Sequence, residues 1–306
     1  MHFSAAKTLI AATAAIPLLT SCASGSSTPA TPLASQPNQV HNVRRQAGCR
    51  CLYVANSGGN SVTVYPVNSS GNVAPSQYIY GSNTDLFSPI GVAVDSRGDI
   101  YVANYGGDSV SVYAVGATGN VTPTAVIDGP NTQLDEPAGV AIDPVNGDIY
   151  VDNYAGGASG GGSVTFYAPG SDGNVAPLGT ISGSNTGLYE NSGLTLDYNG
   201  NIYVPITSNN INVYAAGSVG NVAPTQTIGG SFTKLEEPTQ VALDSSLNVY
   251  AANYAGTSVT AYPSGVSGNV PPTLDISGKK TKLSGSIGVA LDSHGRIYAS
   301  ITPTAP

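Results

Sequence analysis

The sequence predicts an all-β protein built from repeated units, and three observations support this fold class. Charged residues make up only 9% of the 306 residues, so several strong helix formers are scarce. Turn-forming residues are abundant, with 38 Gly and 21 Pro. Short runs of β-branched and aromatic residues recur at a nearly constant interval, which is typical of duplicated structural units.

The N-terminal segment resembles a bacterial lipoprotein signal peptide. Within residues 1–21, Lys7 precedes an apolar run that is shorter than the roughly 20 residues needed to span a bilayer. The run ends in Leu19-Thr20-Ser21-Cys22, which resembles a lipobox, so Cys22 is the predicted lipidation site. The alternative is ordinary signal cleavage after Ala23 and secretion. Residues 22–47 are rich in Ser, Thr and Pro and are predicted to be a flexible tether.

Two cysteines remain if Cys22 carries lipid. Cys49 and Cys51 form an even pair in an oxidising compartment, so they are a candidate disulfide. A bridge between them would close a very small and strained loop. Two reduced thiols and a weak metal contact are alternatives that the sequence leaves open.

From about residue 48 the chain repeats itself. An apolar residue followed by Tyr recurs at intervals of 47 to 53 residues, at Tyr53, Tyr101, Tyr150, Tyr203, Tyr250 and Tyr298. A Gly-Asn-Val turn recurs at Asn72, Asn120, Asn174, Asn221 and Asn269. An Asp lies 23 positions after each of these Asn residues. Such regular spacing indicates duplicated structural units.

Each unit contains four short apolar runs, which we name strands a, b, c and d in chain order. In one unit they cover residues 91–95, 100–104, 109–113 and 123–127. Turn residues such as those of Ser96-Arg97-Gly98 separate them, as in hairpins. Four antiparallel strands per unit of about 48 residues are typical of a β-propeller blade. We therefore predict a β-propeller over residues 48–306.

The number of blades is less determined than the fold. The runs add up to 21 strands, which is five blades and one further strand. We favour six blades with an incomplete last one, in which residues 40–44 would supply a missing first strand. The alternative is five blades, in which residues 288–292 would complete the blade that residues 52–56 begin.

The repeated pattern resembles known propeller families. Residues 89–104 read Pro-Ile-Gly-Val-Ala-Val-Asp-Ser-Arg-Gly-Asp-Ile-Tyr-Val-Ala-Asn, and residues 109–113 read Ser-Val-Ser-Val-Tyr. These units resemble NHL repeats, gluconolactonase-like (SMP-30-like) propellers and YncE-like propellers. The resemblance implies that ligands use the face formed by the d–a and b–c links, which we call the ligand face. In gluconolactonase-like enzymes, Glu, Asn and Asp residues hold a metal at that face.

On the ligand face the sequence offers oxygen-bearing side chains near the ends of strands. The candidate ligand-binding residues are Asn56, Asn104, Glu136, Asp152, Asn153, Glu190, Glu237 and Asn253. One interpretation is an oxygen-rich ring that binds a sugar or a hard cation, for which Ca²⁺ is the natural choice. The other is turn chemistry, since residues repeated in every blade serve every blade. We favour the second and assign no catalytic residue, metal ligand or cofactor.

Three further features bear on function. None of the three histidines, His2, His41 and His294, falls on the ligand face, which argues against a Ser-His-Asp site. The third b–c link contains a Gly-rich insertion, residues 155–162, which we interpret as a surface extension rather than a flap. Lys279, Lys280 and Lys282 concentrate positive charge in the last d–a link, which we interpret as a solvated loop.

These observations predict a membrane-tethered propeller of the cell envelope that acts as a binding scaffold. The formal net charge of −8 argues against nucleic acid as a partner, so an envelope protein or glycan is expected. We expect a monomer that meets the membrane only through its lipid. The alternative function is a metal-dependent, lactonase-like hydrolase, and a third is a structural spacer that binds nothing.

Overall fold

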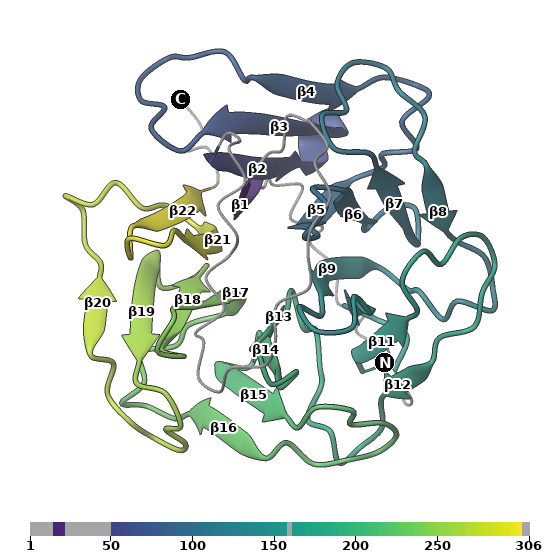
Figure 1. Ribbon diagram of the computed structural model, residues 1–306. Helices are drawn as coiled ribbons and strands as arrows, with labels where there is room; N and C mark the ends of the chain where they lie inside the picture. The colour runs from purple at the N-terminus through teal and green to yellow at the C-terminus, as the bar shows by residue number, and fades with distance from the viewer. Residues whose placement is uncertain (1–14, 22–49, 158–160, 302–306) are drawn as a thin grey trace, which may run out of the picture.

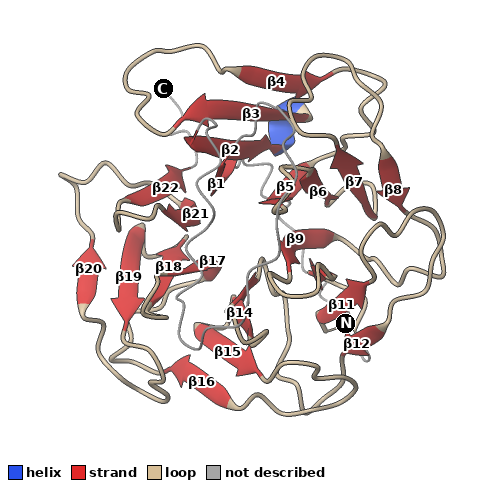
Figure 2. Cartoon of the chain, in the orientation of Figure 1, coloured by secondary structure: helices blue, strands red, loops and turns tan. Residues whose placement is uncertain are grey.

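The computed structural model of the chain describes residues 15–21, 50–157 and 161–301. Its strands form sheets that are arranged in a ring around a central axis (Figure 1). The 3₁₀ helix η1 (Ser57–Gly59) is the one helix in that part of the chain (Figure 2). The all-β propeller predicted from the sequence is therefore confirmed.

Five sheets are complete blades, each with four strands in the order a, b, c, d. Blade 1 contains β1 (Ala15–Ser21), β2 (Arg50–Asn56), β3 (Ser61–Pro66) and β4 (Gln77–Tyr80). Blade 2 contains β5 (Pro89–Val94), β6 (Ile100–Asn104), β7 (Ser109–Tyr113) and β8 (Ala125–Ile127). Blade 3 contains β9 (Pro137–Ile142), β10 (Ile149–Asn153), β11 (Ser163–Tyr167) and β12 (Gly179–Ile181).

The remaining strands complete the ring. Blade 4 contains β13 (Thr195–Leu196), β14 (Ile202–Ile206), β15 (Asn210–Tyr214) and β16 (Gln226–Gly229). Blade 5 contains β17 (Pro238–Leu243), β18 (Val249–Asn253), β19 (Ser258–Tyr262) and β20 (Leu274–Ile276). A two-stranded sheet, which we call the half-blade, contains β21 (Ser286–Leu291) and β22 (Ile297–Ile301). The innermost strands contact one another in the order β1, β5, β9, β13, β17, β21 and back to β1.

The blade count is five complete blades, which is the alternative given above. The ring has six positions, but the sixth is occupied by the two-stranded half-blade and not by a complete blade. β21 does not complete blade 1, because it pairs with β22 while β1 pairs with β2. Residues 40–44, the expected first strand, lie outside the described residues.

β1 comes from the apolar run that the sequence predicts to be the core of the signal peptide. In the structure of the whole chain, the segment Ala15–Ser21, which includes the end of this run, pairs with β2 from Ala15 opposite Asn56 to Ser21 opposite Arg50. The predicted lipidation site Cys22, the tether and Cys49 lie outside the described residues. Cys51 is buried in the core between blades 1 and 2, and the disulfide with Cys49 remains a prediction.

The hydrophobic cores lie between neighbouring blades. One core joins Tyr53, Val62 and Ile79 of blade 1 to Val102 and Tyr113 of blade 2, and all five side chains are fully or almost fully buried. Each large apolar side chain buried in this way contributes roughly 1.5–3 kcal/mol of hydrophobic stabilisation. Because every core needs two blades, the ring as a whole holds the links of the ligand face in place.

Repeated hydrogen bonds fix the links between the strands. The tyrosine that ends strand c donates its hydroxyl to a threonine carbonyl oxygen in the preceding d–a link. The four pairs are Tyr113 with Thr84, Tyr167 with Thr132, Tyr214 with Thr186 and Tyr262 with Thr233. Burial raises the pKa of all four phenols. These tyrosines are therefore packing residues with a polar tip.

Candidate ligand-binding face

The asparagines that end the b strands hold strand b to strand c. The side-chain amide of Asn104 donates to the hydroxyls of Ser109, at 3.2 Å, and Ser111, at 2.9 Å. Asn153 and Asn253 make the equivalent pairs of bonds with the hydroxyls that follow them. All three are fully buried, and their Oδ1 atoms accept backbone N–H groups of the d–a links.

Asn56 is half-buried and donates to the Thr63 hydroxyl at 3.2 Å. Blade 4 carries Ile206 at this position, and the register of the half-blade places Ile301 there. The four asparagines bond to groups of their own hairpins, as the turn interpretation expects, and their role in ligand binding stays a prediction.

The aspartates at the a–b turns, on the opposite face, are also turn residues. Asp197 Oδ1 accepts the backbone N–H groups of Asn199, at 2.8 Å, and Asn201, at 2.9 Å. Asp95, Asp244 and Asp292 make the same two bonds. Asp143 accepts the N–H groups of Val145 and Asn146 instead. These contacts account for the five aspartates as turn residues.

Three glutamates precede strand a on the ligand face. Glu136, Glu190 and Glu237 adopt left-handed backbone conformations, with φ of 52°, 46° and 49°. The backbone N–H of Glu136 donates to Asp108 Oδ1, and that of Glu237 donates to Asn209 Oδ1, both of which belong to the preceding blade. The backbone of Glu136 and Glu237 is thus fixed by the preceding blade. Glu237 is exposed, whereas Glu136 and Glu190 are half-buried.

Two of these glutamates pair with tyrosines. Burial, followed by the hydrogen bond and the charge of the Glu136 carboxylate, raises the pKa of the Tyr105 phenol. Burial, followed by the charges of Glu190 and Glu136, raises the pKa of Tyr154 to about 12. The two rings meet edge to face, with their centroids 5.9 Å apart. We call these four residues the tyrosine–glutamate arc; they come from b–c and d–a links of blades 2 to 4.

Exposed rings lie beside the arc. Phe87 and Tyr189 belong to the d–a links that lead into blades 2 and 4, and they are 56% and 53% exposed. Together with the half-buried rings of Tyr105 and Tyr154, they give one side of the ligand face an aromatic surface with carboxylates between the rings. Sequence reasoning noted the glutamates but did not select these tyrosines among the 18 in the chain.

Asp152 is the clearest asymmetry in the ring. At its position in strand b the other sheets carry Ala55, Ala103, Pro205, Ala252 and Ser300. Its carboxylate is fully buried and accepts a hydrogen bond from Asn191 Nδ2, which also donates to the Asn153 carbonyl oxygen at 3.1 Å. Burial raises the pKa of Asp152 well above its ordinary value.

Two oxygens of this pair, Asp152 Oδ2 and Asn191 Oδ1, have no hydrogen-bond partner among the described residues. Sequence reasoning missed Asn191. It replaces the Pro that begins strand a in three other blades, Pro89, Pro137 and Pro238, and this departure from the repeat was the available signal.

The Gly-rich insertion of blade 3 packs against the same pair. A Cβ on Gly162 would collide with the Asn191 side chain, and one on Gly161 would lie 2.9 Å from the Leu188 carbonyl oxygen. Glycine is therefore required where this link reaches blade 4. Residues 158–160 of the insertion lie outside the described residues.

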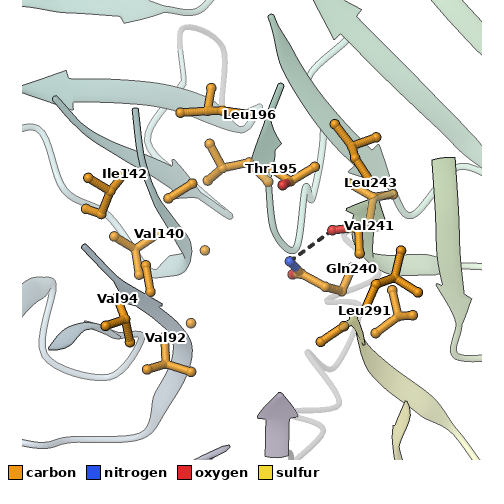
Figure 3. A pocket seen from close by; sticks show the side chains of 18 residues that line it. Val92, Val94, Val140, Ile142, Thr195, Leu196, Gln240, Val241, Leu243 and Leu291 are labelled. Carbon is orange, nitrogen blue, oxygen red and sulfur yellow. Dashed lines mark hydrogen bonds between the residues drawn. The ribbon is translucent and has the colours of Figure 1, made fainter. Parts of the chain in front are cut away.

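The central cavity is formed by the inner strands and has a volume of about 210 Å³ (Figure 3). Most of the side chains that line it are aliphatic, including Val92, Val140, Leu196 and Leu291. Thr195 and Gln240 are the polar side chains among them, and none of the candidate asparagines, aspartates or glutamates lines the cavity. Within the described ranges, no group of three or more His, Cys, Asp or Glu residues lies close enough to hold a metal ion.

Comparisons with known proteins support the fold. No protein-family model and no curated protein sequence matches the chain. Among solved structures, it is similar to the WD40 β-propeller domain of Doa1, with a TM-score of 0.56 and 11% identity over 82% of this chain and 72% of that one. It is also similar to a chain of a nidogen/laminin complex, with a TM-score of 0.57 and 18% identity over 78% of this chain and 80% of that one. At these identities the likeness shows the propeller fold alone, and the resemblance to NHL and gluconolactonase-like repeats remains a prediction.

Membrane attachment is a separate matter from the fold. The described residues contain no helix that is both long and apolar enough to cross a membrane.

Proposed function

We propose that this protein is an extracytoplasmic propeller that binds an envelope protein or glycan through its ligand face and is anchored through a lipid on Cys22. The observation that carries the proposal is the tyrosine–glutamate arc with its exposed neighbours Phe87 and Tyr189. Aromatic side chains are enriched in binding interfaces, where they cover apolar surface and keep a polar edge. Carboxylates between the rings would accept hydroxyl or amide hydrogens of the partner.

The described geometry supports binding more than catalysis. The candidate asparagines are engaged in hydrogen bonds within the protein, and the carboxylates of the arc face tyrosines rather than one another. The cavity that would hold a small substrate is lined by aliphatic residues apart from Thr195 and Gln240. A scaffold that presents the surface of blades 2 to 4 fits these observations best.

The test compares the same backbone position in different blades. We expect the double variant Glu136→Gln/Glu190→Gln to lose at least tenfold in affinity for partners found by glycan-array and envelope pull-down screens. Glu237→Gln is the matched control, because Glu237 has the same left-handed conformation but lies on blade 5, outside the arc. The proposal fails if the screens find no partner or if the control variant weakens binding as much as the double variant.

A further inference from the structure

Among the described residues, the half-blade has an open edge where the other sheets continue with strands c and d. In blades 2, 3 and 4 all five residues of strand b are buried, whereas the first four residues of β22 are half-buried and Ile301 is 39% exposed. The Arg296 carbonyl oxygen accepts the Asp292 N–H on the β21 side. The backbone groups of Ile297, Ala299 and Ile301 therefore point to the open side, since peptide groups alternate along a strand.

The d–a link before the half-blade has the same threonine that accepts a hydrogen bond from strand c in the complete blades. In four blades a threonine carbonyl oxygen of the d–a link accepts a tyrosine hydroxyl from the strand c that follows. Thr281 is the equivalent residue, since its hydroxyl bonds the Gly278 carbonyl oxygen as that of Thr84 bonds Gly81. No described tyrosine donates a hydrogen bond to the Thr281 carbonyl oxygen.

Blade 1 lacks its expected neighbour on the same side. In the other blades a glycine of the c–d turn forms a parallel bridge with strand d of the preceding blade, as Gly119 does with Ile79. The valine two residues later packs against the core between the two blades, at Val121, Val175, Val222 and Val270. At the equivalent place in blade 1, Val73 is 43% exposed and no described strand bridges Gly71.

A groove lies between the half-blade and blade 1 at the start of β22. It has a volume of about 510 Å³ and is lined by Val67, Asn68 and Ser69 of blade 1 and by Arg296, Ile297 and Tyr298 at the start of β22. The open edge, the Thr281 carbonyl oxygen and the exposed Val73 thus surround the positions that strands c and d occupy in the complete blades.

We propose that this place binds a β-hairpin of an acidic partner protein, which completes the half-blade by strand addition. Strand addition satisfies the backbone groups of an open sheet edge and selects alternate side chains through the flanking surface. The partner hairpin has the pattern of this chain's own strands c, with β-branched and hydroxyl residues in alternation and a tyrosine at the end.

The positive charge beside the open edge favours an acidic partner over the chain's own basic segment as the occupant. Lys279, Lys280 and Lys282 flank Thr281, and no ion pair joins them to a carboxylate of the described residues. The carboxylates nearest to them in sequence have partners of their own, since Asp275 pairs with Lys234 and Asp292 with Arg296. Residues 22–49 carry Arg44 and Arg45 and no acidic residue, so like charges disfavour that segment as the occupant.

The test uses the full chain and a synthetic peptide of residues 108–128, the c–d hairpin of blade 2 with Asp108 and Asp128 at its ends. We expect saturable binding in fluorescence anisotropy that weakens as salt is raised. Ala299→Pro removes an N–H from the open edge and is expected to weaken binding at least tenfold, whereas the control Ala299→Ser keeps it. Replacing the three lysines of the link with Glu is expected to weaken binding about as strongly.

Hydrogen exchange of the β22 amides identifies the occupant. In the free chain we expect fast exchange at Ala299 and Ile301, and protection when the peptide is added. Protection in the free chain at every concentration would show that the chain covers its own edge, and protection that rises with concentration would show a second copy. Either of these exchange results would overturn the proposal. So would the absence of peptide binding, or equal binding by the Ala299→Pro variant.

Discussion

At the scale of single residues, Asp152 distinguishes blade 3 from every other blade. Its carboxylate is buried where other blades carry Ala or Pro, and one of its oxygens has no partner among the described residues. A buried carboxylate without full hydrogen bonding is costly when ionised, which is why burial raises its pKa. The folded state therefore holds a proton on this group at pH values where the unfolded chain has lost it.

The first prediction concerns the effect of this proton on stability. Because the folded pKa lies above the ordinary value of 3.8, stability falls as pH rises through and above that value. Asp152→Asn removes the ionisation, so the variant should lose this pH dependence and gain about 1–3 kcal/mol at pH 7. Thermal unfolding from pH 4 to pH 7 measures both effects. A variant less stable than the wild type at pH 7 would contradict the prediction, because it would mean that the fold stabilises the ionised carboxylate.

The second prediction concerns the tyrosine–glutamate arc. Tyr154 should still be mostly protonated at pH 11, because burial and the nearby glutamates raise its pKa to about 12. NMR titration of ¹³Cζ-labelled tyrosine, assigned with Tyr154→Phe, measures this directly. Glu190→Gln should lower the pKa of Tyr154, whereas Glu237→Gln should leave it unchanged. A phenol that titrates near 10 in the wild type would contradict the geometry of the arc.

At the scale of elements, buried asparagines connect strand b to strand c in blades 2, 3 and 5. Each side chain spans the hairpin and also accepts an N–H from a d–a link, so it joins three segments of the ligand face. The face is therefore rigid at the ends of the strands, and differences among blades come from residues that depart from the repeat.

The third prediction tests this role. Asn104→Ala should lower the free energy of unfolding by about 1–3 kcal/mol, because buried hydroxyls and an N–H lose their partner. Asn56→Ala is the matched comparison and should cost less, since Asn56 is only half-buried. Denaturant unfolding measures both variants. If neither variant lowers the free energy of unfolding, the asparagines are not needed for stability and ligand binding becomes the better explanation of them.

The repeat made most strands predictable, because apolar alternation and turn residues act over short distances. Strand a of blade 4 is an informative exception. Residues 193–197 have the same pattern as the other a runs, but the strand shortens to Thr195–Leu196. There Asn191 replaces the usual Pro and its side chain turns toward Asp152 of the neighbouring blade. Contacts of this kind depend on a residue in another repeat, so the pattern within one repeat cannot reveal them.

At the scale of the whole molecule, the closure of the ring is the feature that the sequence determined least. Closure depends on which strand lies beside β2, and the candidates are distant along the chain. The segment Ala15–Ser21 fills that place in the whole chain, although it overlaps the apolar run that has the features of a signal peptide. Hydrophobic residues suit both roles, so composition alone does not separate them.

The fourth prediction concerns this segment. If Cys22 is lipidated, the protein expressed with its own N-terminus should fractionate with membranes and begin at a diacylated Cys22, and Cys22→Ser should abolish both results. Mass spectrometry of the N-terminal peptide decides the matter. Cleavage would also remove β1, so the amides on the inner edge of β2 should exchange faster in the processed protein. A mature protein that begins after Ala23 and is released from cells would support secretion instead.

The proposed scaffold binds a partner through its ligand face without a metal-dependent reaction. Calorimetric titration of the protein with Ca²⁺, Mg²⁺, Mn²⁺ and Zn²⁺ is the decisive test, with Glu136→Gln and Glu237→Gln as the compared variants. We predict no tight site for any of the four ions, because the asparagines of this face are engaged within the protein. One tight site that is lost in Glu136→Gln and kept in Glu237→Gln would contradict the scaffold and favour a lactonase-like hydrolase.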